Sequence, residues 1–202
     1  MAGFLEAWIS LAVRLAGTAS WIGGGFILAS AGMIATEVLL RKLLLVSLGG
    51  ADEISGYAFA VGTSWALAFT LLERANVRVD ALYMRFGGRV RACCDVLALA
   101  SLALFVGLLG WHALHTLAAS VQYASRATTP LATPLWIPQG LWVAGFGLFL
   151  FCATPLILRS LLAFIAGDFV TVRRLAGART VQEDAAQESS HLRAAPPGYA
   201  PR

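Results

Sequence analysis

The chain has 202 residues, of which 58% are hydrophobic and 13% are charged, and its formal net charge is +4. Soluble domains carry about 25% charged residues, so this composition excludes an ordinary soluble domain and favours a membrane protein. The positive charge would indicate nucleic-acid binding in a soluble protein. Here the arginines lie between and after the apolar segments, where membrane topology explains them better.

Four segments without an acidic or basic residue other than histidine are each long enough to cross a bilayer, because a spanning helix needs about 20 mostly apolar residues. We therefore predict an all-α membrane protein in which residues 15–170 form a domain of four transmembrane helices. The four segments are 15–36, 54–72, 96–125 and 127–158.

Residues 1–14 precede the first of these segments and have the pattern of an amphipathic helix. Apolar residues recur at helical spacing, whereas Glu6, Ser10 and Arg14 are four residues apart and share the opposite face. We interpret this segment as a short interfacial helix that lies on the membrane. The alternative is that it only extends the first span. It has no basic n-region, so we expect no cleavable signal peptide.

The distribution of arginines predicts the orientation in the membrane. Five arginines lie in 73–91 and four in 159–179, whereas the other side has only Arg41, Lys42 and Arg126. Positive residues concentrate on the cytoplasmic side, so we expect both termini in the cytoplasm. Residues 171–202 are rich in small and polar residues and predict a disordered cytoplasmic tail.

Catalytic and nucleotide-binding motifs are missing from the sequence. It has no P-loop, nucleophile elbow, HExxH or paired ExxH pattern, so we expect no enzyme, no cofactor and no metal site. The spacing of Cys93, Cys94 and Cys152 does not fit a zinc site, and we interpret them as reduced packing residues.

His112 and His115 are ionisable residues within the third span, which makes them functional candidates. A membrane haem protein would need axial histidines on facing helices, and the remaining histidine, His191, lies in the predicted tail. We therefore favour neutral histidines that are hydrogen-bonded between helices over a b-type haem carrier.

Small residues repeat every four positions along the second span. Such a ridge lets another helix approach closely, so it predicts a helix-packing surface. Its members are Gly56, Ala60, Ser64 and Ala68.

Charged residues at the ends of the spans are the other candidates for contacts between helices or subunits. Glu37 and Arg41 are four residues apart with the acidic residue first, an arrangement that favours an ion pair within one helix. Glu53, Arg74 and Asp80 follow at the ends of the second span. We expect some of these charges to pair with another subunit, and the alternative is that they only anchor helix ends.

The order of several segments resembles the DctQ-type small permease subunit of TRAP (tripartite ATP-independent periplasmic) transporters. The resemblance covers about residues 15–160. It includes Arg41, the pair Asp52-Glu53, the span with Trp65, the run ERANVRVDALY at 73–83 and the run TTPLATPLWIPQGLWVAGFGLF at 128–149. Family members often have a histidine where this chain has Asn76, so a role tied to that imidazole is not carried over.

The resemblance implies a subunit of the bacterial inner membrane that braces a large permease. The large subunit would take up an organic acid with a sodium gradient, after a periplasmic binding protein delivers the acid. Arg41, Glu53, Arg74 and Asp80 match the family pattern and would serve as interface or structural charges. The alternatives are a small subunit of a tricarboxylate-type tripartite system, a b-type haem electron carrier, and a free-standing structural protein.

Overall fold

The computed structural model describes residues 2–47, 49–75 and 86–177, and this part of the chain is built from helices. Asp80 and residues 178–202 therefore lie outside the described residues. The helices are α1 (Ala2–Leu44), α2 (Ala51–Leu72), α4 (Gly88–Gln122), α5 (Trp136–Ile165) and α6 (Phe169–Ala176).

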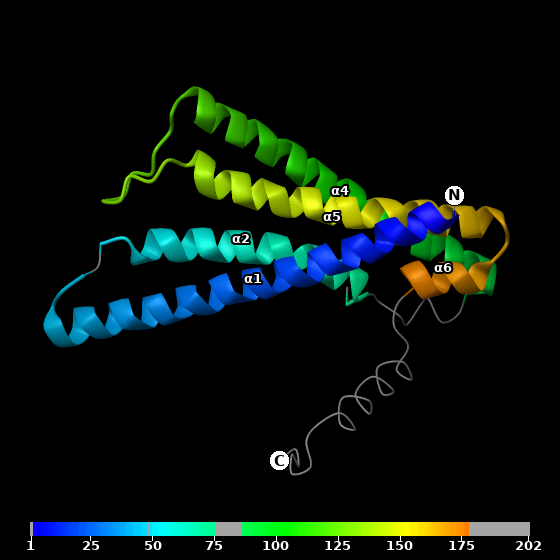
Figure 1. Ribbon diagram of the computed structural model, residues 1–202, viewed down its shortest axis with the longest axis horizontal. Coiled ribbons are helices and arrows are strands. Elements are labelled where there is room, and N and C mark those ends of the chain that lie inside the picture. Colours follow the sequence, from blue (N-terminus) through cyan, green and yellow to red (C-terminus); the bar gives the residue numbers. More distant parts are fainter. Residues whose placement is uncertain (1, 48, 76–85, 178–202) are drawn as a thin grey trace, which may run out of the picture.

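Four of these helices are long and apolar enough to cross a membrane: α1, α2, α4 and α5. This confirms the prediction of an all-α membrane protein with four spanning helices. They form two hairpins, α1–α2 and α4–α5, that lie side by side, with α2 packed against α5 (Figure 1). The N-terminus and α6 lie at one end of the molecule, and loop 123–135 lies at the other end near the start of α2. We call the latter the loop end.

The N-terminal segment is not a separate short helix, because α1 runs without a break from Ala2 to Leu44. Its 43 residues span about 64 Å, twice the thickness of a bilayer core. Three contacts tie its first turns to α5. The Trp8 and Phe151 rings are 5.5 Å apart, Cys152 Sγ donates to the Ala12 carbonyl at 3.8 Å, and Arg159 pairs with Glu6 at 3.3 Å.

The amphipathic pattern of residues 2–14 thus has a different cause from the one we expected. Ala12 is completely buried and Leu5 is buried, and the ring and hydrogen-bond contacts place this face of α1 on the C-terminal half of α5. Packing within the chain therefore accounts for the pattern, and the expected boundary at residue 14 is corrected. Whether these turns lie in the membrane interface stays a prediction.

The segment after α5 also differs from the expected tail, which was to begin at residue 171. The chain turns at Gly167, whose φ is +76°, and α6 folds back onto α4 and α5. Asp168 caps α6 by accepting a hydrogen bond from the Thr171 N–H at 3.0 Å. The hydroxyl and the N–H of Thr171 lower the pKa of this carboxyl. Val172 and Ala176 are buried, so residues up to 176 belong to the packed structure.

Two very close approaches of backbone hold α2 between its neighbours. A Cβ at Gly62 would lie 2.7 Å from the Gly23 carbonyl oxygen of α1. A Cβ at Gly145 of α5 would lie 2.8 Å from the backbone carbon of Ser64. Next to the second contact, the Trp65 Nε1–H donates to the Leu141 carbonyl at 2.8 Å. Small residues are needed at both crossings, since lipid supplies no hydrophobic drive for helix association and packing must be tight.

We expect Gly62→Ala to lower the thermal stability of the purified protein, because the new methyl group would collide with α1 and overpacking costs about 1–3 kcal/mol. Gly24→Ala is the matched control, since Gly24 is also in a helix but has open space at its Cβ. Thermal unfolding in detergent would compare the two. Equal midpoints would show that the α1–α2 crossing does not depend on this contact.

Candidate functional site

The last turns of α1 contain a buried carboxylate. Arg41 Nη2 donates to Glu37 Oε1 at 2.7 Å, which confirms the predicted ion pair one helical turn apart. The Glu37 side chain is only 4% exposed, whereas that of Arg41 is 61% exposed. Ser47, just after the helix, donates to the same oxygen at 2.6 Å. The Glu37 carboxylate therefore folds the connector between α1 and α2 back onto the end of α1.

A second buried carboxylate, that of Glu53, lies in the first turn of α2. Tyr57, one turn later, donates its hydroxyl to Glu53 Oε1 at 2.9 Å. The Thr129 hydroxyl of loop 123–135 donates to Oε2. Glu53 thereby joins the two hairpins at the loop end through residues that are 76 positions apart in the sequence.

Both carboxylates line one small cavity of about 110 Å³ between α1, α2 and loop 123–135. Its walls also include the backbone of Gly49 and Gly50. A cavity of this size with polar walls has room for a few water molecules. The charged or hydroxyl-bearing residues around it are Glu37, Arg41, Ser47, Asp52, Glu53 and Thr129.

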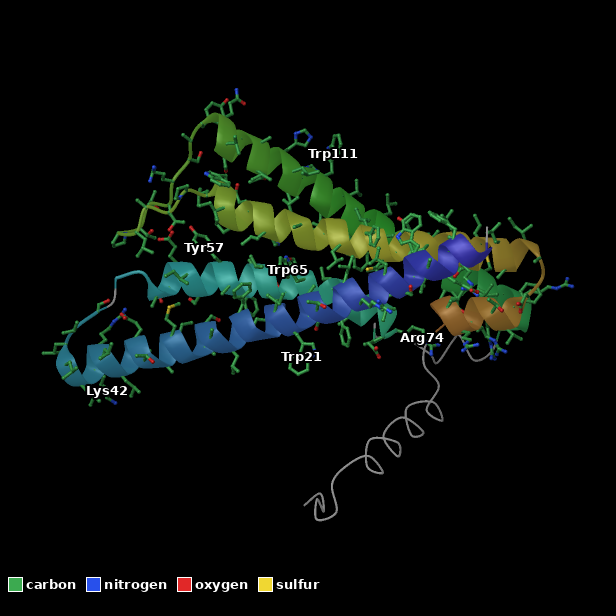
Figure 2. The ribbon with its side chains drawn as sticks, viewed as in Figure 1. Trp21, Lys42, Tyr57, Trp65, Arg74 and Trp111 are labelled. Atoms are coloured by element: carbon green, nitrogen blue, oxygen red, sulfur yellow. The ribbon has the colours of Figure 1, made fainter. Side chains whose placement is uncertain are left out.

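The four charged candidates from the sequence do not form one cluster. Arg41 and Glu53 line the same cavity. Arg74 comes two residues after the end of α2 and lies at the opposite end of that helix, whereas Tyr57 lies at the loop end (Figure 2). Asp80 lies outside the described residues. The structure thus brings two of the four charges together.

The small ridge on α2 is divided between two environments. Ser64 and Ala68 are buried inside this chain, with Ser64 against Gly145 of α5. Gly56 is exposed and has open space at its Cβ, and Ala60 is partly exposed. Ser64 and Ala68 are therefore occupied by packing within the chain, and only Gly56 and Ala60 remain available to a second subunit.

The histidines do not match the expected hydrogen-bonding role between helices. His112 and His115 are both exposed on α4, and the His115 ring packs edge-on against Trp111 of the same helix at 4.9 Å. In the described part of the chain, histidines are therefore not found on facing helices, as axial haem ligands would require. Within the same residues, no group of three or more His, Cys, Asp or Glu side chains is placed to hold a metal ion.

Sequence reasoning missed some of the polar residues that the fold brings together. Thr129 belongs to a proline-rich loop, and nothing local shows that it contacts Glu53. Tyr57 is four residues after Glu53, and this spacing on one helix face could have predicted the hydrogen bond between them. Asp95, which is completely buried on α4, looked like one charge among many in the connector before the third span.

The sequence model of the family described as "Tripartite ATP-independent periplasmic transporters, DctQ component" matches residues 30–163, about two thirds of the chain. The chain belongs to the DctQ family. It is therefore a small membrane subunit of a TRAP transporter, a system that also contains a large permease and a periplasmic binding protein. No curated protein and no solved structure matches the chain.

The matched region has a clear relation to the fold of this DctQ protein. It begins within α1 and ends near the end of α5, so it contains all the residues around the cavity. It leaves out residues 2–29 of α1 and all of α6, and both of these helices pack against α5. The loop end thus belongs to the family region, and the end with α6 lies in part beyond it.

The division of the ridge leads to a test of helix packing. We expect Ser64→Leu to lower the thermal midpoint of the isolated protein, because the larger side chain would force α2 away from Gly145. Gly56→Leu on the same helix should leave this midpoint unchanged, since its Cβ meets open space. Unfolding of both variants in detergent checks this, and an equal loss of stability for Gly56→Leu would contradict the assignment.

Proposed function

We propose that this DctQ protein braces the stationary part of the large permease while that subunit takes up an organic acid with a sodium gradient. A periplasmic binding protein would deliver the acid. The match to the DctQ family carries this proposal. The absence of nucleotide-binding and nucleophile motifs from the sequence agrees with it, because a bracing subunit needs packing surfaces and not a reaction centre.

The apolar surface of the chain supports a role between lipid and a larger partner. α1 contacts α2 and α5 and leaves much of its length uncovered, with Trp21 86% and Leu28 76% exposed. On α2, the exposed Phe59 lies near the open Gly56 and the partly exposed Ala60. Close approach of a second subunit is easiest where small residues bring backbones together. We place the permease contact on this outer side of the α1–α2 hairpin.

Removing the subunit tests the proposal directly. Cells with the large permease and the binding protein, but without this chain, should lose sodium-driven uptake of the cognate solute. Arg41→Ala and Glu53→Ala should reduce uptake or co-purification with the permease. The first removes the guanidinium that pairs with the buried Glu37 carboxylate, and the second removes the acceptor of the Tyr57 and Thr129 hydroxyls.

Arg14→Ala is the matched control for Arg41→Ala, since Arg14 is an exposed arginine in the N-terminal part of the same helix. It should behave like the natural protein. Full uptake in the absence of the chain would refute the bracing role. If Arg41→Ala and Glu53→Ala both match the Arg14→Ala control, the charges around the cavity have no part in transport.

We further propose that the protein lies in the bacterial inner membrane with the loop end on the periplasmic side and both termini in the cytoplasm. The connector of α1 and α2 and loop 123–135 lie at one end, and the N-terminus and the arginine-bearing α6 lie at the other. This arrangement agrees with the arginine distribution. A reporter that is active only in the cytoplasm should work after Arg202 and fail after Gly49, and the reverse pattern would invert the topology.

A further inference from the structure

We propose that the Glu53 carboxylate is part of a pH-sensitive latch that ties loop 123–135 to the start of α2 and releases the loop when it is protonated. The latch consists of two contacts: the hydrogen bond from the loop to Glu53, and the packing of Leu131 on Gly50. This inference rests on the geometry of the loop end. In the proposed topology the latch faces the periplasm.

Loop 123–135 has its own internal hydrogen bonds, so it is built to move as a unit. The Ala127 N–H donates to the Thr133 carbonyl at 3.0 Å, and the Leu135 N–H donates to the Ser125 carbonyl at 3.0 Å. Arg126 also donates to the Ala132 carbonyl at 3.3 Å. These bonds close the loop on itself. They leave its position relative to α2 to the side chains that cross the gap.

Two side chains of the loop make this crossing. Thr129 donates to Glu53 Oε2. The end of the Leu131 side chain occupies the place that a Cβ at Gly50 would take, so Leu131 lies directly on the backbone just before α2. Further along, α2 and α5 are held together independently at Ser64 and Gly145 and at Trp65 and Leu141. The loop can therefore come free without parting the two hairpins.

The protonation state of Glu53 determines how strongly the surrounding hydroxyls bind its carboxyl group. An ionised carboxylate is an acceptor only, and its two oxygens accept from the hydroxyls of Tyr57 and Thr129. Protonation removes the charge of the acceptor, and hydrogen bonds to a neutral carboxyl are weaker than those to a carboxylate. The latch is therefore closed while Glu53 is ionised, and it opens as the pH falls through the titration of this carboxyl.

The other charged groups near Glu53 belong to each element that meets at the loop end. α1 contributes Glu37 and Arg41, which are paired with each other. α2 contributes Asp52, which lines the cavity, and Tyr57. The loop contributes Arg126, whose guanidinium is engaged within the loop. Because the Arg41 charge is taken up by Glu37, the Glu53 contact with the loop relies on hydroxyl donors, and it has no ion pair to hold it closed at low pH.

Spin labels can measure the opening of the latch in the full chain in lipid nanodiscs. One label replaces Thr128 in the loop and the other replaces Phe59 on α2, both exposed positions, in a background where the three native cysteines are replaced. The distance distribution should be narrow at about pH 7.5 and should broaden only when the pH falls well below about 4, the ordinary range for glutamate, because the hydrogen bonds from the hydroxyls favour the ionised form of Glu53. Glu53→Gln, which mimics the neutral acid, should give the broad distribution at both pH values.

Two more variants keep the test decisive. Thr129→Val keeps the carboxylate but removes its donor from the loop, so it should give the broad distribution at both pH values. Glu6→Gln removes an exposed carboxylate at the other end of the molecule and should keep the pH response of the natural chain. A narrow distribution at low pH in the natural chain, or an unchanged pH response in Glu53→Gln, would overturn the latch.

Discussion

The structure depends on the way α2 brings two other helices into backbone contact at almost the same height. Gly62 meets Gly23 of α1, and Ser64 meets Gly145 of α5. Residues two positions apart on a helix point in nearly opposite directions, since each residue turns the helix by about 100°. One short segment of α2 therefore carries both crossings. Because lipid tails are as apolar as the side chains, tight van der Waals contact has to hold the helices together.

The two ends of the molecule are built from different interactions. At the loop end, two buried carboxylates organise the connector of α1 and the loop before α5 through hydrogen bonds. At the other end, the first turns of α1, the end of α5 and α6 pack mainly through apolar residues, with the exposed Glu6–Arg159 pair at the edge. Buried polar groups that are satisfied specify one arrangement of the segments that they join. A defined loop end and an apolar outer surface suit the bracing role that we propose.

Membership of the DctQ family places this chain beside a larger permease, and the fold shows which surfaces remain for that contact. The buried half of the α2 ridge is used to assemble the chain itself. The exposed side of α1 and the Gly56 end of α2 are not covered by other helices of the described chain. The polar cavity lies at one end of this uncovered hairpin, so a partner that binds along α1 and α2 would come close to the two carboxylates.

The sequence by itself determined the membrane class, the four spans, the Glu37–Arg41 pair and the family resemblance. These properties are local, because an apolar run of bilayer length and an ion pair one turn apart depend on neighbouring residues alone. Tertiary structure decided the rest. The amphipathic face of residues 2–14 gave no sign that α5 covers it, and the α2 ridge did not show which of its members meet α5. The contact of Glu53 with Thr129 joins segments 76 residues apart, and such a pairing follows only from how the two hairpins pack, which no single segment encodes.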